Sequence, residues 1–143
     1  MQTLSLGQAA AIVDASLQKA REQHCPPLTV AVLDAGGHLV ALKREDGSGI
    51  LRPQIAQAKA WGALGMGHGG RLLAERAAAA PAFFAALGDI SGGRIAPVAG
   101  GVLVRDNHDN LLGAVGISGD TSDVDESCAV FGIESVGLQA ICD

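Results

Sequence analysis

Apolar residues recur every three or four positions near the start of the chain, which is the spacing of one face of an α-helix. This stripe consists of Leu6, Ala9, Val13, Leu17 and Ala20. Ser5 and Gln8 have the spacing of a capping box, in which each side chain bonds to the backbone of the other residue. We predict a helix over residues 6–23 that ends before Pro26 and Pro27, because consecutive prolines cannot continue a helix.

Two later segments combine β-favouring runs with turn residues. The first is residues 29–45, TVAVLDAGGHLVALKRE, in which two β-rich runs flank Ala-Gly-Gly. The second is residues 100–119, GGVLVRDNHDNLLGAVGISG, in which the polar DNHDN lies between two apolar runs. Glycine adopts the positive φ angles of tight hairpin turns, and Asn and Asp side chains stabilise turns. Each segment therefore predicts a β-hairpin.

Three further helices are predicted between the two hairpins. Residues 51–67 carry apolar residues at helical spacing, and Pro53 suits the first helical turn. The apolar stripe consists of Ile55, Ala58, Trp61 and Leu64. Residues 71–80 and 81–87 predict two short helices that divide at Pro81, since a proline starts a helix more readily than it continues one.

The remaining segments complete the plan of a single domain. Residues 88–101, GDISGGRIAPVAGG, are rich in Gly and Pro and predict an irregular loop. The tail from Ser122 to Cys142 carries two apolar stripes at helical spacing, so we predict one final helix there. A chain of 143 residues without a repeat or a linker has the size of one ordinary domain, residues 1–143.

Composition and charge narrow the class of protein. Hydrophobic residues make up 48% of the chain and 20 residues are glycine, which favours close packing of helices on a sheet in an α/β fold. The net charge is −5 and the ten basic residues are scattered, so we expect no nucleic-acid partner. The longest apolar stretch, AAAAPAFFAAL, is interrupted by Pro81 and is shorter than the roughly 18–20 residues of a membrane span. We therefore expect no membrane partner.

The N-terminus and the cysteines predict a cytoplasmic protein. The first ten residues lack a basic region followed by an apolar core, so we expect no signal peptide. Cys25, Cys128 and Cys142 are far apart, odd in number and outside any CxxC spacing, which favours neither a disulfide framework nor a zinc site. Free cysteines fit a reducing compartment, and we interpret each as a small buried hydrophobic residue.

Residues 65–70, GMGHGG, match the GxGxxG pattern of dinucleotide-binding loops. That fingerprint follows a β-strand, whereas these glycines follow a predicted helix, so we interpret the segment as a joint between two helices. A second interpretation is that free N–H groups at the start of the next helix meet an anion together with Arg71. His68 and Met66 carry the imidazole and thioether groups that bind haem iron axially, and His68 is the candidate iron ligand.

Lys59 and Ser118 are further candidates for chemistry. Lys59 is close to Trp61 in a partly apolar predicted helix, and burial would lower its pKa and fit it for anion binding or proton transfer. The alternative is a surface lysine whose apolar stem lies along the protein. Ser118 in GISGD approaches the GxSxG elbow of serine hydrolases but lacks one intervening residue, so we do not expect a hydrolase.

The acidic segment AVGISGDTSDVDE has two interpretations. Counting from Asp123, acidic residues fall at the first, third and twelfth positions of an EF-hand loop, but the sixth position is Cys128 rather than glycine. We therefore expect no calcium site. The other interpretation is a helix start, in which Thr121 or Ser122 is the cap and the acidic residues of the first turn complement the helix dipole.

Three segments together resemble a known family. They are VAVLDAGGHLVALKREDG, the pair Gly100–Gly101 and GAVGISG, and their order and spacing lie between about Leu4 and Leu138. This arrangement resembles the GlcG/HbpS-like haem-binding family, which also occurs as the C-terminal domain of PduO-type cobalamin adenosyltransferases. The resemblance implies a single antiparallel sheet of about five strands flanked by helices, and a homo-oligomer. It also implies a small-molecule ligand, first of all haem or a related tetrapyrrole.

Glycine-rich segments at the ends of elements predict where the ligand pocket lies, because backbone can approach a ligand closely there. These segments are residues 65–70, Gly100–Gly101 and 118–123. The candidate cofactor-binding residues are His68, Met66, Arg52, Gly100, Gly101 and Ser118.

Two other functions remain open from the sequence. One is an enzyme that acts on a small organic acid by proton transfer, as an isomerase or lyase does, with a cation holding the acid and a carboxylate as base. Its candidate residues are Lys59, Arg52 and His68 for the anion and Asp120, Asp125 and Glu126 for the base. The other is a structural oligomer or adaptor protein without a ligand.

Overall fold

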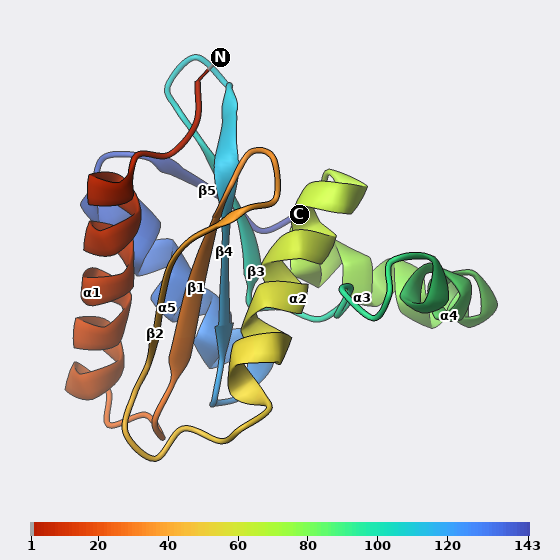
Figure 1. Cartoon of the computed structure of the whole chain (residues 1–143), viewed down its shortest axis with the longest axis horizontal. Helices are drawn as coiled ribbons and strands as arrows, with labels where there is room; N and C mark the ends of the chain where they lie inside the picture. Colours follow the sequence, from red (N-terminus) through yellow and green to blue (C-terminus); the bar gives the residue numbers. More distant parts are fainter. Residues whose placement is uncertain (1) are drawn as a thin grey trace.

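Five helices and five strands form within residues 2–143, the part of the chain that the computed structural model describes (Figure 1). The helices are α1 (Leu6–Glu22), α2 (Arg52–Met66), α3 (Gly70–Ala79), α4 (Pro81–Ile90) and α5 (Ser122–Ser135). The strands are β1 (Thr29–Asp34), β2 (Leu39–Arg44), β3 (Gly101–Arg105), β4 (Leu111–Ser118) and β5 (Gln139–Ile141). Both predicted hairpins are confirmed, as are the predicted helices that precede α5.

The strands make one open sheet in the order β2-β1-β4-β3-β5, and every neighbouring pair is antiparallel. The two hairpins therefore lie side by side, joined through β1 and β4. A bulge between Val32 and Leu33 shifts the register of the first hairpin, so that Leu33 faces Leu39. The single antiparallel sheet flanked by helices confirms the expected α/β (α+β) fold.

The helices cover the two faces of the sheet unequally. In Figure 1, α1 and α5 pack on one face and α2 on the other, while α3 and α4 extend away from the sheet. The core between the sheet and the α1–α5 pair is built from large aliphatic residues, including Ile12, Val30, Val102 and Ile133. The core beneath α2 is smaller and consists of Leu33, Ala60, Ala63, Leu103 and Ala114.

Glycines in the strands let α2 approach the sheet closely. A Cβ atom at Gly116 of β4 would collide with the carbonyl oxygen of Ala56, and one at Gly101 of β3 with that of Lys59. With small residues on both sides, the helix backbone lies almost directly on the strands. This close contact fixes the orientation of α2, and the outward face of the helix forms one wall of the candidate functional site.

The C-terminus differs from the predicted continuous helix. The α5 helix ends at Ser135, Gly137 has a φ of +77°, and β5 then pairs with β3. Leu138, Ala140 and Cys142 pack on the α1–α5 core, whereas Ile141 packs under α2. The last apolar residues thus alternate with the period of a strand, and a window of helical period cannot distinguish this short run from a helix.

The predicted helix starts are confirmed in detail. Ser5 and Gln8 form both bonds of the capping box at α1, and Thr121 caps α5 by accepting from the backbone N–H of Val124. Pro53 and Pro81 lie in the first turns of α2 and α4. The α4 helix continues to Ile90, past the predicted end, and none of its residues is buried. No helix among residues 2–143 has both the length and the apolar character needed to cross a membrane.

Candidate functional site

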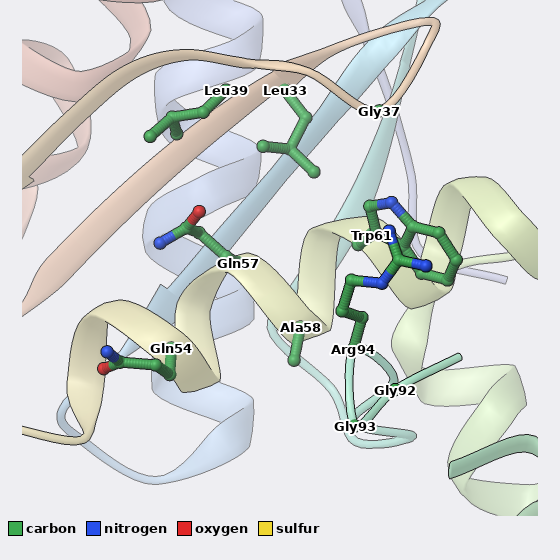
Figure 2. Close-up of a pocket in the computed structure, with 10 residues that line it drawn as sticks. All are labelled: Leu33, Gly37, Leu39, Gln54, Gln57, Ala58, Trp61, Gly92, Gly93 and Arg94. Carbon is green, nitrogen blue, oxygen red and sulfur yellow. The ribbon is translucent and has the colours of Figure 1, made fainter. Parts of the chain in front are cut away.

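A groove runs along the outward face of α2 (Figure 2). Its cavity volume is about 360 Å³, within the range of small-molecule sites. It is lined by Leu33, Gly37, Leu39, Gln54, Gln57, Ala58, Trp61, Gly92, Gly93 and Arg94, and we call this set the α2 groove. The groove therefore lies between the first hairpin and the loop before β3. It includes none of residues 65–70, Gly100–Gly101 or 118–123, so the ligand pocket predicted at those segments stays a prediction that this cavity does not support.

The helix supplies one continuous stripe to the groove. Gln54, Gln57, Ala58 and Trp61 have the spacing i, i+3, i+4 and i+7, which places them on one face of α2. The opposite face carries Ala56, Ala60 and Ala63, which are buried against the sheet. The stripe presents two amides, a methyl group and an indole to the groove, and the partly buried Trp61 also packs against the core beneath α2.

Trp61 and Arg94 form the most chemically distinctive part of the groove. The Arg94 guanidinium lies over the Trp61 ring, 4.2 Å from its centroid, which is a cation–π contact. The Arg94 Nε–H also donates to the Ser91 carbonyl oxygen at 2.7 Å, which holds the loop in place. Gly37 has a φ of +82°, and a Cβ atom there would lie 3.1 Å from the indole nitrogen, so glycine lets the hairpin turn approach Trp61.

The remaining wall of the groove is apolar. Leu33 and Leu39 are direct partners across β1 and β2, so their side chains share the face that carries α2. Leu33 is buried, whereas Leu39 is 49% exposed at the edge strand. An aromatic ring, an aliphatic wall, two amides and one cation suit a planar organic anion with a large apolar surface.

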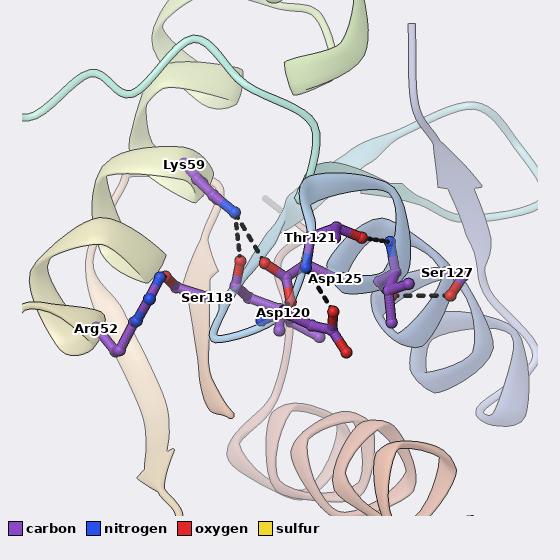
Figure 3. Close-up of polar contacts among 9 residues, drawn as sticks. Arg52, Lys59, Ser118, Asp120, Thr121, Asp125 and Ser127 are labelled. Atoms are coloured by element: carbon purple, nitrogen blue, oxygen red, sulfur yellow. Dashed lines mark hydrogen bonds and ion pairs between the residues drawn. The ribbon is translucent and has the colours of Figure 1, made fainter. Parts of the chain in front are cut away.

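A second polar cluster lies on the other side of α2 (Figure 3). The Lys59 ammonium donates to the Ile117 carbonyl oxygen at 2.8 Å and to Asp125 Oδ2 at 3.2 Å. Asp125 Oδ1 accepts from the Asp120 backbone N–H at 3.0 Å. Lys59 is 3% exposed and Asp125 1% exposed, so the alternative of a surface lysine is wrong. We call these residues, with Arg52 and Ser118, the Lys59 cluster.

Burial dominates the protonation of the central pair. It raises the pKa of the Asp125 carboxyl above its ordinary value, against the Lys59 charge and the Asp120 N–H, which favour the carboxylate. It lowers the pKa of the Lys59 ammonium, against the charge and hydrogen bond of Asp125. Each group is paired and covered, so neither presents a free atom to a substrate in this conformation. Proton transfer to an organic acid therefore gains no support from this pair.

The Lys59 cluster gathers most of the site residues that were predicted from the sequence. Arg52 Nη1 donates to Ser118 Oγ at 3.1 Å, which joins the start of α2 to the end of β4. Gly100 has a φ of +111°, and a Cβ atom there would lie 2.8 Å from Lys59 Nζ, so the glycine makes room for the ammonium. Gly101 packs against the Lys59 backbone. These residues connect α2, β4 and α5.

Glu126 belongs to a separate surface network. It accepts hydrogen bonds from Arg71 Nε and Nη2, and Arg71 also pairs with Asp123. Hydrogen bonds to these two carboxylates raise the pKa of the Arg71 guanidinium above its ordinary value. The network joins the start of α3 to the first two turns of α5. Glu126 therefore does not share a site with Lys59.

Met66 and His68 lie at the joint between α2 and α3. Gly67 ends α2 with a φ of +75°, and the backbone N–H of His68 donates to the Ala63 carbonyl oxygen at 3.2 Å. Gly69 and Gly70 pack tightly on the backbone of Cys142 and Val98. The interpretation of GMGHGG as a joint between helices is confirmed. Neither Met66 nor His68 lines the α2 groove, and their role as cofactor ligands stays a prediction.

The polar side chains of the groove were not among the residues predicted from the sequence. Gln54 and Gln57 continue the Trp61 stripe at helical spacing, and this polar interruption of an apolar stripe is the signal that marks an outward face. No sequence pattern indicated Arg94, because it lies in a loop without periodicity and contacts Trp61 only in the tertiary fold.

Comparison with known proteins identifies the family. A family model described as "Haem degrading protein HbpS-like" matches residues 4–134. The chain belongs to the HbpS-like family. Among the curated proteins compared, none matches the chain.

Solved structures of similar fold cover almost the whole chain. The HbpS protein of Streptomyces reticuli, solved as a double mutant, is 28% identical with a TM-score of 0.83, and the match covers 96% of this chain and 89% of that one. Protein ORFY of Klebsiella pneumoniae is 26% identical with a TM-score of 0.85 and coverage of 96% and 92%. The complex of PduOC with heme is 23% identical with a TM-score of 0.84 and coverage of 95% and 96%. This last similarity concerns the fold alone.

Proposed function

We propose that this HbpS-like protein binds haem or a related tetrapyrrole in the α2 groove. The observation that carries the proposal is the stacked pair of Trp61 and Arg94 beside an aliphatic wall, in a member of a family described by haem degradation. The heme complex of PduOC, which has the same fold, supports the same class of ligand.

The lining residues fit the organic part of such a ligand. The Trp61 ring and the Leu39 side chain provide apolar contact for a macrocycle above the buried Leu33, and Arg94 provides a cation for a carboxylate side chain. The groove is open, since Arg94 and Leu39 are exposed, so a ligand larger than the cavity would extend into solvent. When haem is bound, its iron supplies the redox chemistry, and the protein holds and orients the ring.

A haemin titration followed at the Soret band tests the proposal. We expect saturable binding at one haemin per chain, and binding roughly tenfold weaker, or about 1.4 kcal/mol, in Arg94→Glu, because the substitution repels the carboxylates. Arg76→Glu is the matched control, since Arg76 is exposed on α3 outside the groove. Non-saturable binding by the wild type would refute the function. Equal losses in both variants would show a general effect of charge.

We also propose that the protein forms a homo-oligomer in which a second copy covers α4. This helix, PAFFAALGDI, is strongly apolar, yet Phe83 is 54% exposed and Ile90 78% exposed. Exposed apolar patches on a helix that extends from the body are typical of interfaces. A cytoplasmic location also stays a proposal, supported by the three free cysteines.

A further inference from the structure

The side chains of the α2 groove lack the donors that hold haem iron in proteins. Iron of haem is bound by His, Cys, Met or Tyr side chains. None of the ten described residues that line the groove is of these types. Its polar side chains are instead the amides of Gln54 and Gln57 and the guanidinium of Arg94.

His38 is the histidine nearest to the groove along the sequence, because it stands between the lining residues Gly37 and Leu39. Its side chain is 80% exposed, and its Nδ1 lies 3.2 Å from Asp34 Oδ1. Side chains alternate between the faces of a strand, so Asp34 lies on the opposite face from Leu33. The exposed His38 imidazole is thus bonded to Asp34, whose carboxylate also accepts from backbone N–H groups of the hairpin turn, and His38 does not line the groove.

The groove therefore offers contacts for a tetrapyrrole ring and its carboxylates. It offers no side-chain ligand for a metal at the centre of that ring. From this we propose that the α2 groove recognises its tetrapyrrole through the macrocycle face and the carboxylates, without a bond from any protein side chain to iron. Trp61 and Leu39 contact the ring, Arg94 pairs with a carboxylate, and the glutamine amides bond to polar substituents. The proposal rests on the proposed function and names what that site selects: a planar tetrapyrrole anion, with or without metal.

Parallel titrations with haemin and with metal-free protoporphyrin IX test this inference. Both probes carry the same ring and carboxylates, so we expect dissociation constants within about threefold of each other. Ligand absorbance gives the constants for both probes. The variant His68→Ala, at the joint after α2, and His38→Ala are expected to bind haemin as the wild type does.

The outcomes separate the inference from the function on which it rests. If haemin binds and metal-free protoporphyrin binds more than about tenfold more weakly, an iron ligand exists and the inference fails while the function stands. Loss of haemin affinity or a changed Soret spectrum in His68→Ala or His38→Ala would also overturn it and would identify the ligand. If neither probe binds, the proposed function fails together with the inference.

Discussion

At the scale of single residues, Lys59 and Asp125 form the most deeply buried ion pair among residues 2–143, with side chains 4% and 1% exposed. Removing one partner of such a pair leaves a buried charge without compensation. We expect Lys59→Met to lower the free energy of unfolding by about 3–5 kcal/mol, measured by denaturant titration. The double variant Lys59→Met/Asp125→Leu should recover a large part of this loss.

The matched control is Lys43→Met, because the Lys43–Asp14 pair has a shorter distance but lies at the surface, with side chains 59% and 61% exposed. Exposed pairs contribute little, so this variant should unfold almost as the wild type does. A Lys59→Met protein as stable as Lys43→Met would contradict the burial of the ion pair.

The same pair gives a prediction for pH. In Lys59→Met, Asp125 keeps its burial and loses its cation, so its pKa in the folded state rises further above that in the unfolded state. Such a carboxyl takes up a proton on folding, so stability is lost as the pH rises through the folded-state pKa and regained as the pH falls. The deficit of Lys59→Met relative to the wild type should shrink as the pH falls toward the ordinary titration range of a carboxyl group. The double variant lacks both titrating groups, so its own stability should not show the gain on lowering the pH that Asp125 gives Lys59→Met.

At the scale of elements, the start of α5 rests on one cap. Thr121 Oγ1 accepts from the Val124 backbone N–H, whereas the neighbouring Ser122 lies inside the helix. We expect Thr121→Ala to lower the free energy of unfolding, measured by thermal denaturation, by about 1 kcal/mol, because the Val124 N–H loses its hydrogen-bond partner. Ser122→Ala is the control and should change stability much less. Equal effects of the two variants would contradict the assignment of the cap.

The exposed α4 helix gives a prediction for assembly. In native mass spectrometry, the Phe83→Ser oligomer should dissociate into smaller species at protein concentrations at least tenfold higher than the wild-type oligomer does. The reason is that buried aromatic side chains contribute much of the binding energy of an interface. Leu6→Ser is the control, because Leu6 is 66% exposed at the start of α1. An unchanged mass distribution in Phe83→Ser would refute α4 as the interface.

Elements stabilised by local signals were predictable from the sequence, and elements that depend on distant partners were not. The capping box at Ser5, the prolines at the starts of α2 and α4, and the hairpin turns all act within a few residues. The β5 strand has three residues and exists because β3 offers it an edge. That edge is some thirty-five residues away in sequence, so no local window contains the cause.

At the scale of the whole molecule, the candidate site brings together three segments that are distant in sequence. The first hairpin supplies Leu33 and Leu39, α2 supplies Trp61, and the loop before β3 supplies Arg94. The two hairpins were predicted from the residues, whereas the single sheet was implied by the resemblance to the GlcG/HbpS-like family, which the family match confirms. The residues of the Lys59 cluster were predicted as candidates, but their burial was not. Helical spacing shows which residues share a face and not what covers that face.

If the tetrapyrrole binds in the α2 groove as proposed, a bulky side chain that fills the groove must block it. Haemin titrations would compare Ala58→Trp, which places an indole in the middle of the groove, with Ala78→Trp, which adds the same indole at an exposed position of α3. We predict that Ala58→Trp weakens binding by at least tenfold and that Ala78→Trp binds as the wild type does. Undiminished binding by a folded Ala58→Trp protein would contradict the claim.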